Sequence, residues 1–233
     1  MVKPLIFFVH IPKTAGSTIN RHLQNKMPNG RSHCEAIIKD DTKLRRAAET
    51  FDWLSGHVHF GAARSLISAA TNRTIRYFTC MREPTAQVMS HYNWLIEIQR
   101  RGGSFYGNHP PHIKELSDRI SNSDNSNPKI VIENILSRTN LFLNFQSRTI
   151  LGHKFDWKSG AVHQVLSKYE MVAKEKTMLD LIETMTGERP TILERENESG
   201  YHFDRAVFDT AEMKTFLREN NALDETLYSL IPG

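Results

Sequence analysis

The sequence predicts an α/β fold, a three-layer sandwich in which helices flank a mostly parallel central sheet. Two apolar runs, Leu5–Val9 and Thr74–Met81, contain the β-branched and aromatic residues that are typical of buried strands. A segment with apolar residues at helical spacing follows each run. This alternation favours parallel pairing, because a helix between two strands brings the chain back to the edge of the sheet where the first strand began.

Length and composition fit a single globular domain that spans residues 1–233. Hydrophobic residues make up 39% of the chain and charged residues 24%, which are ordinary values for a folded protein. The net charge of +4 is modest and no run of lysines occurs, so the sequence predicts no nucleic-acid partner. An anionic ligand or a polyanionic substrate remains compatible with this charge.

The cysteines and the amino terminus predict a cytoplasmic protein. Cys34 and Cys80 lie far apart and form no metal or redox motif. No segment reaches the ~18 apolar residues that a membrane helix needs. The first residues, 1–4, run straight into the first predicted strand, with no room for a signal peptide.

Capping and turn residues delimit the elements of the first hundred residues. Ser17 or Thr18 is expected to cap the first helix, and Pro84 suits the first turn of a longer helix, where its missing N–H needs no partner. We expect strands at Leu5–Val9, Cys34–Ile38 and Thr74–Met81, and helices at Ser17–Met27, Lys43–Thr50, Ala62–Ala70 and Pro84–Arg101.

The rest of the chain is predicted to be mostly helical, with one further strand. Residues 102–127 are predicted to be a mobile insertion on the substrate side, because two polar loops, Ser104–Pro111 and Ser121–Asn127, flank a weak helix there. The pattern of Leu141–Ile150 is ambiguous. We expect a strand at Met171–Ala173 and helices at Pro128–Ser137, Ala161–Tyr169, Met178–Met185, Thr210–Glu219 and Leu223–Leu230.

A phosphate-binding loop is predicted between the first strand and the first helix. Pro12 disfavours helix at the residue before it and so ends the strand. The helix that follows would direct N–H groups and the positive end of its dipole at an anion. Lys13 would add a full charge, and Gly16 would let the backbone approach the ligand closely. The alternative is a basic turn in an ordinary strand–helix unit.

The residue order differs from the Walker A loop, in which the lysine follows the last glycine. Here Lys13 precedes Gly16 by three positions. The segment Ile11-Pro12-Lys13-Thr14-Ala15-Gly16-Ser17-Thr18 resembles the 5′-phosphosulfate loop of sulfotransferases that use 3′-phosphoadenosine 5′-phosphosulfate (PAPS). It is most similar to the carbohydrate branch, which includes the heparan sulfate 2-O- and 6-O-sulfotransferases.

This resemblance implies a P-loop-like version of the predicted fold. It also implies a soluble, bacterial-type protein, because the Golgi relatives carry a membrane anchor that this sequence lacks. The residues implied to bind the donor are Pro12, Lys13, Thr14, Ala15, Gly16, Ser17 and Thr18.

A second motif follows the strand at Thr74–Met81. Arg82 would lie at the carboxyl end of a parallel strand, where α/β folds bind ligands, and its planar guanidinium suits a phosphate. The pattern strand–Arg–Glu–Pro–x₅–Ser resembles the 3′-phosphate site of the same family, which implies that Arg82 and Ser90 hold the ribose 3′-phosphate. Taken alone, Arg82 could instead form a surface ion pair, for example with Glu83.

Later segments resemble the family less closely. Asn144-Phe145-Gln146-Ser147-Arg148 is similar to its Asn-x-Gln-[Ser/Thr]-Arg element, and residues 169–175 are similar to its late strand and turn. Arg148 could contact the nucleotide or the acceptor, or form a structural ion pair. Arg195–Gly200 could close over the adenine.

The segment His57-Val58-His59 allows three interpretations. A metal site would need two further ligands, and no Cys, His or Asp cluster has a matching spacing. A histidine could be structural, buried beside Trp53 or Phe60. The third interpretation is catalytic, because Gly56-His57-Val58 resembles the segment with the histidine base of the 2-O-sulfotransferases.

These motifs together predict an enzyme that transfers a sulfuryl group from PAPS to the hydroxyl of a carbohydrate or a small molecule, without a metal. Lys13 and His57 are the expected catalytic residues, and the bisphosphate nucleotide PAP is the expected product. One alternative is a P-loop nucleotide kinase, which would need magnesium and ATP. Another is an inactive nucleotide-binding adaptor, which would keep Arg82 and Ser90 but tolerate the loss of His57.

Overall fold

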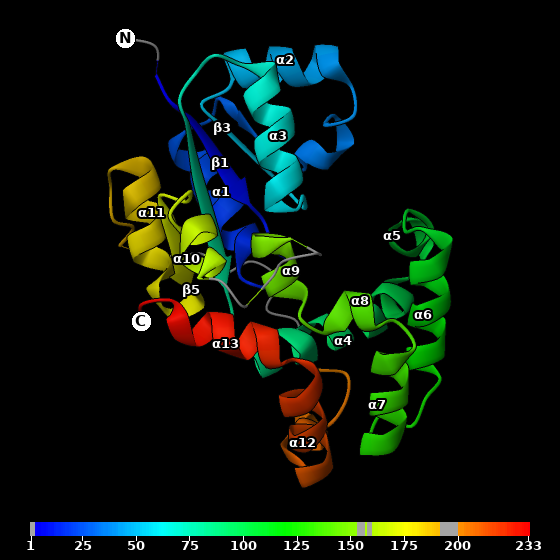
Figure 1. Ribbon diagram of the computed structural model, residues 1–233. Helices are drawn as coiled ribbons and strands as arrows, with labels where there is room; N and C mark the ends of the chain where they lie inside the picture. Colours follow the sequence, from blue (N-terminus) through cyan, green and yellow to red (C-terminus); the bar gives the residue numbers. More distant parts are fainter. Residues whose placement is uncertain (1–2, 153–156, 158–159, 192–199) are drawn as a thin grey trace. The chain divides into compact units, whose positions relative to one another are not determined.

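A computed structural model describes residues 3–152, 157, 160–191 and 200–233 of the chain (Figure 1). The chain divides into two compact units, each with a hydrophobic core of its own. The first unit comprises Met1–Arg82, Gln146–Asn197 and Tyr228–Gly233, and the second comprises Glu83–Phe145 and Glu198–Leu227. Among the described residues, no helix combines the length and the apolar character that crossing a membrane requires.

The first unit is built on a parallel sheet. In the part of the chain that the structure describes, the strands run parallel in the order β2-β3-β1-β4-β5. Their bounds are β1 (Leu5–Val9), β2 (Gly30–Arg31), β3 (Trp53–Gly56), β4 (Ile75–Met81) and β5 (Met171–Lys174). Every residue of β1 is buried, as expected for the central strand of a sheet that is covered on both faces.

Helices cover both faces of this sheet, so the predicted three-layer α/β fold is confirmed (Figure 1). On one face, Ile6 and Phe8 of β1 share a core with α1 and α11. On the other face, Phe7 contacts Tyr77, and Tyr77 meets Phe60 of α3 edge-on with 5.2 Å between the ring centroids. The helices of this unit are α1 (Gly16–Lys26), α2 (Asp41–Thr50), α3 (Phe60–Ala70), α9 (Phe145–Leu151), α10 (Ala161–Leu166) and α11 (Met178–Thr186). The first residue of α9, Phe145, belongs to the second unit. The first unit also contains the 3₁₀ turns η1 (Cys34–Ala36) and η2 (Glu175–Thr177).

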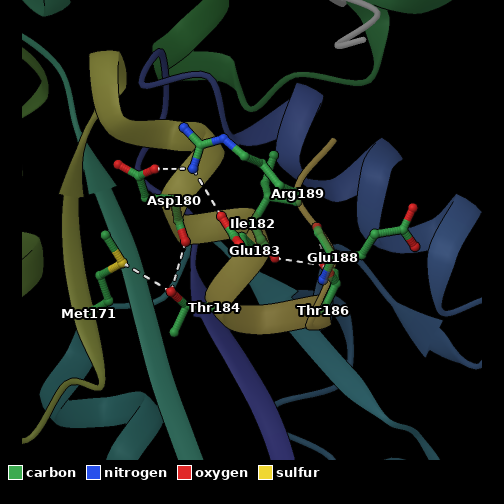
Figure 2. A network of polar contacts seen from close by, with 8 residues as sticks. All are labelled: Met171, Asp180, Ile182, Glu183, Thr184, Thr186, Glu188 and Arg189. Carbon is green, nitrogen blue, oxygen red and sulfur yellow. Dashed lines mark hydrogen bonds and ion pairs between the residues drawn. The ribbon is translucent and has the colours of Figure 1, made fainter. Parts of the chain in front are cut away.

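Polar contacts hold the carboxyl end of α11, which packs against β4 and β5 (Figure 2). Gly187 has a φ of +79° and lets the chain leave the helix in the left-handed conformation. The chain then turns back, and the Arg189 guanidinium donates to the carboxylates of Asp180 and Glu183. Thr184 donates its hydroxyl to the Asp180 carbonyl at 2.7 Å. The predicted helix around Met178–Met185 is therefore anchored on its exposed side as well as in the core.

The second unit is helical where the structure describes it. Its longest helix buries Val88, Tyr92, Leu95 and Ile96, the face that the sequence pattern predicts. The Tyr92 hydroxyl accepts from Asn134 at 3.0 Å. The helices are α4 (Pro84–Arg101), α5 (Gly103–Gly107), α6 (Pro111–Ser121), α7 (Pro128–Leu136), α8 (Thr139–Phe142), α12 (Ala211–Asn220) and most of α13 (Ala222–Leu230), with a 3₁₀ turn η3 (Arg205–Asp209).

The strand predicted at Cys34–Ile38 is wrong. This segment begins with the 3₁₀ turn η1 instead, and β2 and β3 form that side of the sheet. The turn is held by Glu35, whose carboxylate accepts from the backbone N–H of His57 at 3.1 Å. Local sequence cannot reveal this contact, because its two partners lie 22 residues apart.

Two other segments also differ from the expected pattern. Part of the predicted loop Ser104–Pro111 forms α5, and the helix after it buries Ile113, Leu116 and Ile120. The ambiguous segment Leu141–Ile150 contributes to α8 and α9. The mobility of residues 102–127 and their place on the substrate side stay predictions.

Candidate functional site

The predicted phosphate-binding loop lies at the carboxyl end of the central strand β1, within the first unit. Lys13 and Ala15 each have a φ of +68°. Left-handed conformations of residues other than glycine cost free energy and cluster at functional sites. Tight turns of this kind also direct successive backbone N–H groups into one concavity, which suits an anion.

Helix α1 begins at Gly16, directly after this loop. Its N-cap residue is Ala15, so the expectation that Ser17 or Thr18 caps the helix is wrong. Ala15 itself offers no side-chain cap to the amino end of α1, and the first turn of the helix contains no acidic residue. The positive end of the helix dipole is therefore not offset by a carboxylate of its own cap or first turn.

The requirement for glycine at position 16 comes from His10. A Cβ atom there would lie 1.9 Å from Cδ2 of the His10 ring. His10 follows β1 directly and is 5% exposed, and Asn20 donates to its Nδ1 at 3.3 Å. Burial, reinforced by the charges of His57, His33 and Lys13, lowers the pKa of His10 to about 2. His10 is therefore neutral, and its ring occupies the space that a side chain at position 16 would need.

The other residues of the loop differ in burial. Thr14 is fully buried, and its hydroxyl donates to the Ile11 carbonyl at 2.9 Å. Its side chain thus closes the loop on itself and leaves only its backbone to face a ligand. Pro12, Lys13 and Ser17 are half-buried, and Thr18 is buried. All seven residues predicted to bind the donor therefore lie in this loop and the first turn of α1.

Arg82 follows β4, the neighbour of β1, and contacts the same loop. Its Nη1 lies 3.4 Å from the Lys13 carbonyl oxygen. Its ion-pair partner is Glu175, with 3.1 Å between Nε and the carboxylate. Glu83, the partner considered from sequence, instead caps α4 by accepting from the backbone N–H of Ala86 at 2.6 Å. Arg82 is thus held beside Lys13 by an acidic residue that lies far along the chain.

Gln146 gives the Asn144–Arg148 element a structural role. Its side-chain oxygen accepts from the Arg82 backbone N–H at 2.9 Å, and its amide donates to the Arg82 carbonyl at 3.0 Å. Gln146 is fully buried. This paired contact fixes the backbone where β4 ends, and so fixes the base of the Arg82 side chain.

Ser90 and Arg195–Gly200 complete the predicted nucleotide contacts. Ser90 lies on α4 in the second unit and is half-buried, so its pairing with Arg82 stays a prediction. Residues 195–199 lie outside the described residues. The contribution of the Arg148 side chain also stays a prediction.

The exposed imidazole of His57 lies against the buried ring of His10, with 4.3 Å between the ring centroids. Its Nδ1 donates to the His10 carbonyl at 2.9 Å, which leaves Nε2 as the proton acceptor of the neutral ring. Partial desolvation of the ring lowers the pKa of His57; the hydrogen bond to His10 and the charge of Glu35 oppose this shift, and His33 reinforces it. A neutral His57 with a free Nε2 lone pair can act as a base near pH 7.

His59 occupies a different environment. It is the N-cap residue of α3, it is half-buried, and its Nδ1 donates to the Arg148 carbonyl at 3.2 Å. Gly56, directly before His57, opens no space for an acceptor. A Cβ atom at position 56 would meet Glu35 Oε2 at 2.5 Å and Cys34 Sγ at 2.6 Å, so that space is filled.

The fold also assembles a cluster that the spacing of residues did not predict. His33, Glu35 and His57 each offer a potential ligand atom, and these atoms lie within 4.8 Å of one another. The residues come from the segment before β3 and the segment after it, so no short sequence motif contains them.

An open hollow of about 410 Å³ lies beside α3 in the same unit. Its apolar lining includes Phe60 and Leu151, and Arg64 and Lys168 add positive charge. Phe60 and Arg64 of this lining belong to α3, which begins three residues after His57.

Comparison with known proteins does not assign the chain. None of the protein-family models compared with it matches, and no curated protein matches its sequence significantly. The resemblance to PAPS-dependent sulfotransferases therefore stays a prediction from the sequence motifs alone.

Proposed function

We propose that this protein is a cytoplasmic enzyme that transfers a sulfuryl group from PAPS to the hydroxyl of a carbohydrate or a small molecule. The observation that carries the proposal is the meeting of the two motifs at one edge of the sheet. Arg82, which follows β4, contacts the carbonyl of Lys13, which follows β1. The two motifs lie 69 residues apart in sequence, and ligands of α/β folds bind at this edge.

The loop would hold the 5′-phosphosulfate of the donor. Backbone N–H groups of residues 14–18 and the amino end of α1 supply partial positive charge, and Ser17 and Thr18 supply hydroxyls. Thr14 contributes its backbone only, because its hydroxyl is already bonded to Ile11. Arg82 and Ser90 would bind the 3′-phosphate, and Arg82 would then share its guanidinium between this phosphate and Glu175.

The transfer would be an in-line displacement at sulfur. The acceptor oxygen forms a bond to sulfur while the bond from sulfur to the bridging phosphate oxygen breaks, and PAP leaves. Lys13 neutralises the charge that develops on that bridging oxygen, which is stabilisation made mainly in the transition state. Positioning and charge supply most of the rate enhancement in loose transfers of this type.

His57 would take the proton of the acceptor hydroxyl at Nε2. Three observations support His57 over His59: its ring is exposed, its tautomer leaves Nε2 free, and it contacts His10, which lies against the start of α1. His59 is committed to the N-terminus of α3 and to the Arg148 carbonyl.

Incubation with radiolabelled PAPS and a panel of hydroxyl acceptors tests the proposal. We expect label in an acceptor with the wild type and strongly reduced transfer with Lys13→Ala. Phosphate transfer from ATP that requires magnesium would instead identify a nucleotide kinase. Tight binding of PAP without transfer to any acceptor, and without an effect of His57→Ala, would identify an adaptor.

A further inference from the structure

The cluster of His33, Glu35 and His57 is built like a metal site, although the proposed transfer needs no metal. Glu35 lies between the two histidines. Its Oε1 is 2.9 Å from His33 Nδ1, and its Oε2 accepts from the His57 backbone N–H at 3.1 Å. The two imidazole rings meet nearly edge-on, at 61° and 5.6 Å between centroids.

Two nitrogen ligands and one carboxylate, with coordination positions left open, form a donor set that suits zinc and similar ions. Magnesium and calcium prefer oxygen ligands alone. Zinc ligands lie about 2.0–2.2 Å from the ion, so the potential ligand atoms must come closer together than their 4.8 Å limit. His33 can supply this movement, because its ring is exposed.

The surroundings of His57 already orient it as a ligand. Histidines that bind metals usually donate their second ring N–H to a carbonyl or a carboxylate, which fixes the tautomer and the ring. His57 Nδ1 donates to the His10 carbonyl in this way, so Nε2 presents its lone pair. The buried His10 ring packs against the His57 imidazole, with 4.3 Å between the ring centroids.

We propose that His33, Glu35 and His57 bind one divalent transition-metal ion of the zinc type, and that this ion blocks His57 as a base. The blocking part rests on the proposed function. A metal bound at Nε2 occupies the lone pair that would take the acceptor proton. Zinc is therefore an inhibitor of transfer that acts at the acceptor side and leaves the nucleotide loop free.

Metal binding is measured first, without any substrate. The full chain is titrated with Zn²⁺ by calorimetry and with Co²⁺ by visible absorption. We expect one ion per chain. His33→Ala and Glu35→Gln should each weaken binding by at least about tenfold, since even the loss of a residue that only orients a ligand costs 10–100-fold. His112→Ala, an exposed histidine on α6, is the matched control and should bind like the wild type.

Equal affinity in the wild type, His33→Ala and Glu35→Gln would overturn the site. Thermal melting without metal shows whether a variant folds. His33→Ala keeps the test decisive if Glu35→Gln does not fold.

Inhibition is measured second, and each variant is compared with its own rate without metal. Zinc should inhibit wild-type transfer, a chelator should restore it, and the zinc concentration for half inhibition should rise at least tenfold in His33→Ala. Transfer that continues in the presence of saturating zinc would overturn the blocking step. If no PAPS-dependent transfer exists, the proposed function fails, whereas the titrations still decide whether the site binds metal.

Discussion

Two neighbouring strands, β1 and β4, each lead into a helix, and the two helix starts differ in charge. At the start of α1 the N-cap residue is Ala15, which has no capping side chain, the first turn has no acidic residue, and the loop before it contributes Lys13. At the start of α4, Glu83 places its carboxylate on the backbone N–H groups of Thr85 and Ala86. Similar local architecture thus yields one helix start that can accept an external anion and one that its own carboxylate occupies.

Under the proposed function, this difference separates the two candidate bases, Glu83 and His57. A carboxylate that caps a helix is held as an acceptor, so Glu83 is poorly placed to act as a base. His57 contacts the His10 ring, which in turn lies against Gly16 at the start of α1. The following predictions test this contrast.

The largest effect is expected for His57→Ala, compared with Glu83→Gln. Loss of the base should lower kcat by roughly 10²–10⁴, whereas Glu83→Gln should leave kcat near the wild type. Steady-state kinetics at saturating PAPS and acceptor measure both. The assignment of the base to the α1 side fails if Glu83→Gln is the inactive variant.

The pH profile sharpens the same test. Partial desolvation holds the pKa of His57 below its ordinary value of 6.5, and the proposed base works in its neutral form. The wild-type rate should therefore rise with pH below 6.5 and level off above it. His57→Ala should lack this rise, and a rise centred well above pH 6.5 would point to a different group.

Removal of the charge before α1 comes next. Lys13→Ala should lower kcat by about 10²–10³, the usual cost of losing one group that stabilises developing negative charge. The melting temperature should stay near that of the wild type, because Lys13 is half-buried and lies in a loop. Weaker PAPS binding with unchanged kcat would reduce Lys13 to an anchor.

Arg82 is expected to have an intermediate effect, on affinity. A hydrogen bond to a charged group contributes about 1.5–3 kcal/mol, so Arg82→Ala should weaken PAP binding by one to two decades and erase most of its advantage over adenosine 5′-monophosphate. Glu175→Gln should act in the opposite direction, by a few-fold, because it releases Arg82 from its ion pair. Calorimetry with both nucleotides measures these changes, and equal affinities in the wild type would contradict the 3′-phosphate site.

The smallest effect is expected at the capped helix. Glu83→Ala removes the cap of α4 and should destabilise the fold by about 0.5–2 kcal/mol, without a change in PAP affinity. Chemical denaturation and calorimetry give the two numbers. A large loss of PAP affinity would mean that the α4 start, too, belongs to the ligand site.

The elements that the sequence predicted correctly have local signals. The residues of β1, β4 and α4 show runs of apolar residues, helical spacing and a proline in the first turn of a helix. β3 was not predicted as a strand, because its four residues include no β-branched residue and end in serine and glycine.

The parts that were missed depend on distant partners. Glu175 forms an ion pair with Arg82 and lies 93 residues away in sequence. Gln146 holds the Arg82 backbone by hydrogen bonds and lies 64 residues away. His10 carries one local signal, a polar residue directly after a buried strand. Its contact with Gly16 could not be foreseen, because it depends on how tightly the loop turns.

The contact between His10 and Gly16 has a consequence for protein engineering. The His10 ring lies against Gly16 of the predicted phosphate-binding loop, and the His10 carbonyl orients His57. A methyl group added at position 16 would displace the His10 ring, and this displacement would also affect the His57 imidazole, which contacts that ring. A redesign of this loop must therefore consider Gly16, His10 and His57 together, because a change at one of them affects the other two.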